Sequence, residues 1–134
     1  MILTFKTKKS AEVAFAYLTD MQKFVTVHPI IYKIEKIKDN TYLVYETLPI
    51  LFLPFSFTYT ITLASDSQTK TVIIQATVLK INKIKMVFMI TGGSDFTTIQ
   101  EEINFQTPLP VKLLMRRIFK KQHEQLFKNI DSAG

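Results

Sequence analysis

The most constraining feature of this sequence is a long stretch, from about residue 30 to residue 107, in which apolar and polar residues alternate. A period of two places successive side chains on opposite faces of an extended chain, which is typical of half-buried β-strands. The pattern is clearest in residues 55–63, where aromatic and aliphatic residues alternate with Ser and Thr. Short polar connectors occur at residues 38–40, 65–70, 81–82 and 91–95. They predict hairpins and an antiparallel meander of six strands, with Gly92 and Gly93 supplying positive φ angles in the last turn.

The residues before this stretch predict one more strand and two short helices. Residues 2–8 alternate well enough for a strand. Ser10 is a good N-cap for the first helix, and a second helix should follow from residue 21 to about residue 27. We expect His28 to end that helix, because the residue before Pro29 avoids helical geometry.

The residues after the stretch predict one long helix. Pro108 and Pro110 stop the last strand, and apolar residues then recur at helical spacing through residues 111–130. We therefore expect an α+β fold: a curved antiparallel seven-stranded sheet, two short helices, and a long C-terminal helix across the concave face. A chain of 134 residues can bury a real core, so residues 1–134 are expected to form a single domain.

The two faces of the long helix differ in chemistry. The apolar face contains Val111, Leu114, Met115, Ile118, Phe119, Leu126 and Ile130. Gln122 lies among them, and a buried amide without a partner costs about 1–3 kcal/mol. Its partner is either a strand residue such as Gln100 or a polar group of a ligand. The opposite face carries Lys112, Arg116, Arg117, Lys120, Lys121 and Lys128. This basic face is either simply solvated or a surface for anionic lipid headgroups.

The long helix could cover either a filled core or a cavity. Large and adaptable side chains on the inner faces of two strands would suit a flat or flexible apolar ligand. The residues expected to line a pocket are Phe57, Tyr59, Met86, Phe88, Gln100, Met115, Phe119, Gln122 and His28. For His28 the alternative is a loop histidine that bonds to the main chain.

The last strand carries two neighbouring acidic residues. Glu101 and Glu102 point to opposite faces of the strand, so they cannot act together as a carboxylate pair. Glu102 shares its face with Thr98 and Gln100, and this row is a candidate polar wall of the pocket. His123, at the edge of the helix's apolar face, is expected to be half-exposed.

Two segments resemble a known family. FKTKKSAEVAFAYLTDMQKFVTVHP and EEINFQTPLPVKLLMRRIFKKQHEQLFKNI are similar to the START/Bet v 1-like superfamily, often called SRPBCC. The second is similar to the last strand and closing helix of polyketide cyclase/dehydrase-like members. The resemblance implies a helix-grip fold over essentially the whole chain. It also implies a cavity for lipids, sterols, polyketides or other hydrophobic molecules between the sheet and the long helix, with cyclase activity in some members.

Composition excludes several classes of site. The absence of Cys excludes disulfides, thiol nucleophiles and thiolate metal sites, and is compatible with the cytosol. Neither HxH nor HExxH occurs, and we expect no metal or cofactor. The net charge of +6 favours anionic partners. No nucleic-acid-binding motif is present, however, and we do not expect the protein to bind nucleic acid. The first residues lack the order of a signal peptide, so a cytoplasmic location is expected.

Three hypotheses follow for the function. The leading one is a non-enzymatic protein that binds or carries a small hydrophobic or lipid-like molecule, with possible contact of its basic helix face with an anionic membrane. The second is a cyclase- or dehydratase-like enzyme that uses His28, Tyr59, Glu102 or Gln122 in the cavity. The third is a filled-core module whose basic helix face binds an acidic partner. Ligand identity and oligomeric state are left open.

Overall fold

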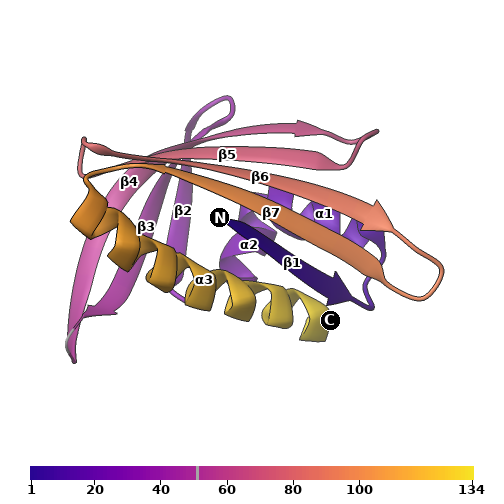
Figure 1. Cartoon of the computed structure of the whole chain (residues 1–134). Coiled ribbons are helices and arrows are strands. Elements are labelled where there is room, and N and C mark those ends of the chain that lie inside the picture. Colours follow the sequence, from indigo (N-terminus) through magenta and orange to yellow (C-terminus); the bar gives the residue numbers. More distant parts are fainter. Residues whose placement is uncertain (51) are drawn as a thin grey trace.

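A computed structural model describes residues 1–50 and 52–134 of the chain, with only the main chain at residue 50 (Figure 1). The strands are β1 (Ile2–Thr7), β2 (Ile31–Lys38), β3 (Thr41–Ile50), β4 (Leu53–Asp66), β5 (Thr71–Val78), β6 (Asn82–Gly92) and β7 (Thr97–Gln106). The helices are α1 (Ala11–Thr19), α2 (Met21–Val27) and α3 (Leu109–Ser132). The predicted order of elements is confirmed.

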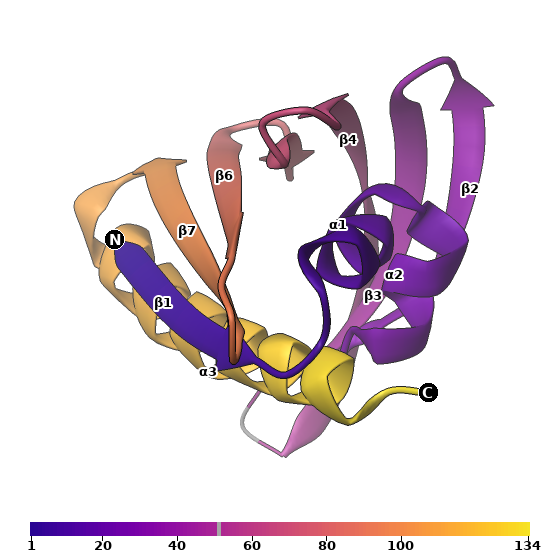
Figure 2. The same ribbon diagram turned by 90° about the vertical axis from the view of Figure 1, so that its right-hand side faces the viewer.

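The strands form one antiparallel sheet in the order β1-β7-β6-β5-β4-β3-β2. Strands β2 to β7 are a meander of consecutive hairpins, as the period-two pattern predicts. The first strand completes the sheet by pairing with the last, with Ile2 opposite Glu102 and Thr7 opposite Thr97. The two edge strands are β1 and β2. Figure 2 shows that the sheet curves strongly between them. The curvature creates the concave side on which the helices lie.

The two short helices have well-defined ends. Ser10 caps α1 by accepting a hydrogen bond from the main-chain amide of Val13 at 3.2 Å. Asp20 ends α1 and caps α2, because its carboxylate accepts from the amides of Gln22 and Lys23 at 3.0 and 3.3 Å. His28 ends α2, as its position before Pro29 predicts. The caps fix both helices against the sheet near β5, β6 and β2.

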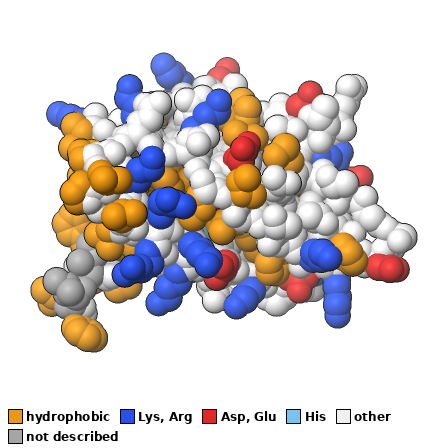
Figure 3. Space-filling view, in the orientation of Figure 1, with side chains coloured by type: hydrophobic (Ala, Val, Ile, Leu, Met, Phe, Trp, Pro, Cys, Tyr) orange, Lys and Arg blue, Asp and Glu red, His pale blue; other side chains and the backbone are white. Residues whose placement is uncertain are grey.

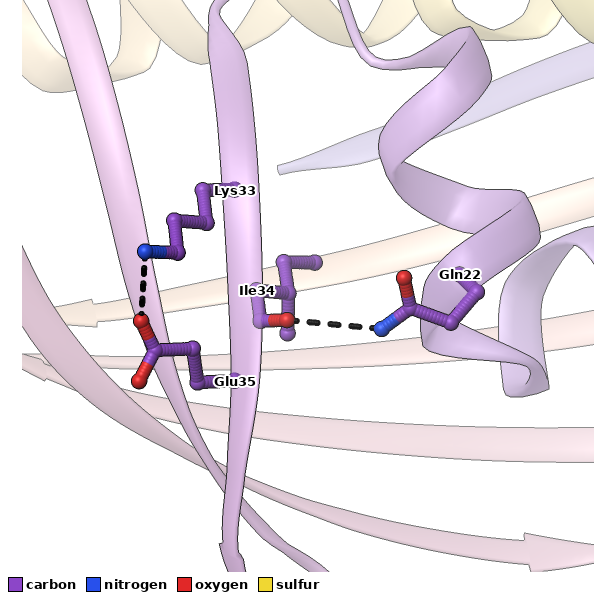
Figure 4. Close-up of polar contacts among 4 residues, drawn as sticks. All are labelled: Gln22, Lys33, Ile34 and Glu35. Carbon is purple, nitrogen blue, oxygen red and sulfur yellow. Dashed lines mark hydrogen bonds and ion pairs between the residues drawn. The ribbon is translucent and has the colours of Figure 1, made fainter.

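One side-chain contact ties α2 to the edge strand β2 (Figure 4). The amide of Gln22 donates to the main-chain carbonyl of Ile34 at 3.4 Å. Lys33 and Glu35 lie on the other side of the strand and form an exposed ion pair at 2.8 Å. An exposed pair of this kind contributes little to stability. Ile34 itself is buried.

Helix α3 packs most tightly near its C-terminus. Leu126, Phe127 and Ile130 are fully buried, and the ring of Phe127 stacks on that of Phe5 in β1 at 5.5 Å. The main chain of α3 approaches β1 and α2 most closely. Near the N-terminus of α3 the prediction of an apolar face packed on the sheet is wrong in part, since the side chains of Val111 and Leu114 are 41% and 56% exposed. The sheet therefore does not cover those two side chains.

The turns differ from the sequence prediction in two places. The β5–β6 turn lies at residues 79–81 rather than 81–82, and Leu79 and Lys80 take positive φ angles there. Gly92 and Gly93 were expected to have positive φ angles, and this is wrong, because neither does. Gly93 is instead required by a close approach, since a Cβ atom there would lie 2.7 Å from the carbonyl oxygen of Phe96.

Candidate functional site

A cavity of about 110 Å³ lies between the sheet, the end of α2 and the middle of α3. A cavity needs only about 10–15 Å³ to hold one water molecule, so this one has room for a small organic molecule. Its walls come from β2 to β6 and from residues 115–122 of α3. All the side chains that line it are apolar except those of His28, Glu46, Tyr59 and Gln122. The cavity is therefore an apolar space with a small number of polar groups in its wall.

Seven of the nine predicted pocket residues line this cavity. They are Phe57, Tyr59, Met86, Met115, Phe119, Gln122 and His28. They come from four separate parts of the chain, which the curved sheet and α3 bring together. Whether these residues contact a ligand stays a prediction.

The other two predicted residues lie elsewhere. Phe88 is on the inner face of β6, but it is fully buried between the rings of His123 and Phe127. Gln100 lies on the outer face of β7, because the inner positions of that strand are the buried ones, Ile99 and Glu101. The suggested bond between Gln100 and Gln122 is therefore wrong.

The polar row predicted on β7 also faces the wrong way. Thr98, Gln100 and Glu102 share the outer face, and Glu102 is exposed. Glu102 therefore cannot serve the cavity as an acid or base. His28, Tyr59 and Gln122, the other residues that the enzyme hypothesis requires, do line the cavity.

Glu46 and Tyr59 form the polar pair of the cavity wall. The Tyr59 hydroxyl donates to Oε1 of Glu46 at 2.9 Å across the β3–β4 ladder. Burial raises the pKa of Tyr59 well above its ordinary value, and the neighbouring carboxylate raises it further, so the phenol keeps its proton. Burial also raises the pKa of Glu46, although the bond from Tyr59 and the charge of His123 oppose this rise. Sequence reasoning missed Glu46, although it is two residues from Val44 and therefore shares the inner face of β3 with it.

His28 both lines the cavity and bonds to the main chain. Its Nδ1 accepts hydrogen bonds from the amides of Ile30 and Ile31 at 3.3 and 3.1 Å. An accepting Nδ1 requires that the proton of the neutral ring sits on Nε2. Burial lowers the pKa of His28 well below its ordinary value, and the charge of His123 lowers it further. The ring is therefore neutral at pH 7 and offers one N–H donor.

A buried hydrogen-bonded pair, Glu101 and His123, lies beside the cavity. Nδ1 of His123 is 2.7 Å from Oε1 of Glu101, and both side chains are almost fully buried. The prediction that His123 is half-exposed is wrong, because Phe119 and Phe127 of its own helix and Phe88 of β6 surround the ring. The second oxygen of Glu101, Oε2, has no hydrogen-bond partner among the residues that the structure describes.

The sequence held a signal for this pair that was overlooked. Glu101 lies on the same period-two face as the apolar residues Ile99 and Ile103, which are buried. His123 is four residues from both Phe119 and Phe127, at the spacing of one helix face. An ionisable residue on each of two facing apolar surfaces predicts that the two side chains meet.

Gln122 lines the cavity next to this pair. In the part of the chain that the structure describes, no side chain or main-chain group forms a hydrogen bond with its amide. The ring of the adjacent His123 lies 6.2 Å from that of His28. The turn of α3 that carries Gln122 therefore lies near His28.

The described residues also restrict other kinds of site. Within residues 1–50 and 52–134, no three His, Asp or Glu side chains converge to hold a metal ion. Over the same residues, no helix combines the length and the apolar character needed to cross a bilayer.

Comparison with solved structures shows the same fold along nearly the whole chain. The di-domain ARO/CYC BexL from the BE-7585A biosynthetic pathway superposes with a TM-score of 0.77 at 6% identity, covering 98% of this chain and 44% of that one. This chain thus spans less than half of the di-domain protein. A START superfamily protein from Mycobacterium smegmatis gives 0.70 at 15% identity, with 98% and 93% covered. A Thalictrum norcoclaurine synthase mutant, in complex with a transition state analogue, gives 0.71 at 14% identity, with 98% and 90% covered.

These likenesses define the class of fold. All three identities are low, so they show the fold alone, which is an α+β helix-grip fold like that of these proteins. No protein-family model and no curated protein matches the sequence. The fold agrees with the resemblance in the two sequence segments, and it leaves the activity to be argued from the cavity.

Proposed function

We propose that this protein binds and carries a small hydrophobic molecule in the cavity beneath α3, as a cytoplasmic carrier. The observation that supports this most is the cavity itself, about 110 Å³ with walls that are apolar apart from four side chains. Removing apolar surface from water contributes about 25 cal/mol per Å² to binding. Met86 and Met115 line opposite walls and can adapt to the shape of a ligand.

Retention of a ligand by the purified protein tests the proposal. The protein is incubated with a lipid extract, separated from free lipid and measured by native mass spectrometry. We expect a bound apolar molecule, which is lost in Ala76→Leu, because Ala76 lines the cavity and the larger side chain fills it. The matched control is Ala64→Leu, since Ala64 is exposed on β4. Equal retention by both variants, or no retention by the native protein, would contradict carriage.

A second role, contact with an anionic membrane, is favoured by an exposed apolar rim at one end of the molecule. The rim consists of Phe52, Leu53 and Phe55 at the β3–β4 hairpin and Leu109, Val111, Leu113 and Leu114 in α3. Figure 3 shows apolar side chains gathered at the end of the molecule where α3 begins, with Lys and Arg side chains beside them. Arg116, Arg117 and Lys120 are exposed on the adjoining turns of α3. Apolar insertion flanked by cations fits an anionic bilayer surface.

Vesicle co-sedimentation tests this second role. We expect binding to vesicles that contain phosphatidylglycerol and much weaker binding to pure phosphatidylcholine. The double variant Phe52→Ser/Leu53→Ser should lose binding. Its control is Ile2→Ser/Ile37→Ser, because those two residues are exposed on the edge strands β1 and β2. Equal binding to both kinds of vesicle would contradict an electrostatic contact.

A further inference from the structure

The polar groups of the cavity gather at one end of it. Glu46 of β3 lies opposite Ile31 of β2 in the ladder, and the amide of Ile31 donates to the ring of His28. Tyr59 reaches the same carboxylate from β4. Gln122 is adjacent to His123, whose ring is 6.2 Å from that of His28. Short links therefore hold all four polar lining residues around a single region.

Bonds within the protein use only part of the hydrogen-bonding capacity of these groups. The Tyr59 proton is donated to Oε1 of Glu46, and Nδ1 of His28 accepts from two main-chain amides. No described residue bonds to Oε2 of Glu46, to Nε2–H of His28 or to the amide of Gln122. The cavity thus presents one anionic acceptor, one neutral donor and one amide that can do either.

This set of groups discriminates between ligand head groups. A hydroxyl both donates and accepts, so it can donate to Glu46 and accept from His28 or Gln122. A carboxylate would place a second negative charge beside Glu46 in a site of low dielectric, where repulsion is strong. An ammonium can donate to Glu46 and to the amide oxygen of Gln122, but it leaves the Nε2–H of His28 without an acceptor. A pure hydrocarbon would leave every one of these groups unpaired and out of water.

We propose that the polar end of the cavity selects apolar molecules that carry an alcohol or phenol hydroxyl over those that carry a carboxylate. This proposal rests on the proposed function, since it concerns the ligand of the same cavity. The buried Glu101–His123 pair supports the selection by holding the turn of α3 that carries Gln122 against β7. The apolar walls then accept the rest of the molecule with little discrimination.

Four probes of one size and shape separate the head groups. They are 2-naphthalenemethanol, 2-naphthoic acid, 2-naphthylmethylamine and 2-ethylnaphthalene, and their binding to the full chain is measured by calorimetry at pH 7. We expect the alcohol to bind at least about tenfold more tightly than each of the other three probes. The reason is that the acid, the amine and the hydrocarbon each leave a buried polar group unpaired or repelled. Tighter binding of the acid or the amine overturns the hydroxyl assignment. Equal binding of all four overturns it too but leaves cavity binding intact, whereas binding of none of them contradicts both proposals.

Matched variants test which groups make the selection. In Glu46→Gln the charge is lost at nearly constant shape, so we expect the preference for alcohol over acid to fall to within about threefold. The control is Glu102→Gln, the same change on the outer face of the sheet, which should keep the preference. Gln122→Leu should weaken the alcohol about fivefold and leave 2-ethylnaphthalene equal or tighter, while Gln125→Leu, exposed on the same helix, should change neither. An unchanged preference in both Glu46→Gln and Gln122→Leu would overturn the proposal.

Discussion

The two halves of α3 cover the sheet in contrasting ways. In the C-terminal half, Leu126, Phe127 and Ile130 are at most 1% exposed and pack against β1 and β6. In the N-terminal half, Leu113 and Leu114 are 60% and 56% exposed, and Met115 and Phe119 border a cavity. The curved sheet is close to the helix at one end and distant at the other. A single helix thus provides both a sealed core and the roof of a binding space.

The Glu101–His123 pair marks the boundary between the two halves. It is buried on the closed side, while Gln122 and His28 face the cavity on the other. The polar groups of the two halves differ in the partners that they have within the protein. In the closed half, Glu101 and His123 bond to each other, although Oε2 of Glu101 has no partner among the described residues. In the open half, Glu46, His28 and Gln122 border the cavity and keep hydrogen-bonding capacity for a ligand.

The largest expected effect is in the closed half. Phe127→Ala should lower the free energy of unfolding by about 3–5 kcal/mol, because it opens a void in a fully packed region. Phe119→Ala should cost clearly less, since its ring already borders a cavity. Denaturant unfolding of both variants measures the difference. Equal losses would contradict the division of the helix into a sealed and a hollow half.

The boundary pair should give the next largest effect. His123→Leu leaves the Glu101 carboxylate buried without its partner, and we expect a loss of about 3 kcal/mol in unfolding free energy. The double variant Glu101→Leu/His123→Leu should recover most of this loss, because an apolar pair of similar volume has no charge to desolvate. A double variant as unstable as His123→Leu would contradict this. It would mean that the loss comes from removing the Glu101–His123 interaction itself, and not from leaving the Glu101 carboxylate buried without a partner.

The open half should make the stability of the fold depend on pH. His28 has a folded-state pKa well below 6.5, so below about pH 6.5 the unfolded chain takes up a proton that the folded chain does not. Stability should therefore fall as pH falls from 7 to 5, by about 1–2 kcal/mol from this residue. The raised pKa of Glu46 acts in the opposite direction, because the folded state protonates first as pH falls.

The variant His28→Asn isolates the histidine contribution, since the Asn carbonyl can accept the same main-chain bonds. We expect it to be less stable than the native protein at pH 7, with a gap that narrows toward pH 5. Thermal or denaturant unfolding across this range measures the gap. A constant gap would mean that the His28 ring takes up its proton in the folded state as readily as in the unfolded state.

The smallest effect is expected at the exposed rim. Leu113→Ser should change the unfolding free energy by no more than about 0.5 kcal/mol, because Leu113 is 60% exposed. The same substitution at the fully buried Leu126 should be strongly destabilising. A large loss at Leu113 would mean that the N-terminal half of α3 is packed in solution.

Most of the fold could be predicted because it rests on local signals. The alternation in β4 and the cap at Ser10 act between residues close in sequence. Pro29 likewise ends α2 through its own ring geometry. The glycine prediction failed for the opposite reason. Gly93 is needed because Phe96 approaches it, and a contact of this kind is not visible in the local sequence.

The site could be predicted only in part. Period-two spacing brought Tyr59 and Met86 to the inner face, and helical spacing brought Met115 and Gln122 to face them. Spacing alone did not show which inner residues border a void and which are sealed, so Phe88 was misassigned.

Two predictions for β7 were wrong because the outer face of the strand was taken for the inner one. Gln100 and Glu102 were placed inward, so Glu101, which points to the other face of the strand, was left without a role. That partner, His123, is 22 residues away. A one-residue error in the face of a strand exchanges every inward residue for an outward one.

The sequence by itself determined the order of the elements, their amphipathic faces and the side chains available to a cavity, because these depend on periodicity and on neighbouring residues. Only the tertiary structure decided that α3 seals one half of the sheet and stands off from the other. It also decided that Glu101 meets His123 and that Glu46, Tyr59, His28 and Gln122 share one end of a hollow. The physical reason is the curvature of the sheet, which sets distances between residues far apart in sequence and so divides a uniform apolar interior into core and cavity.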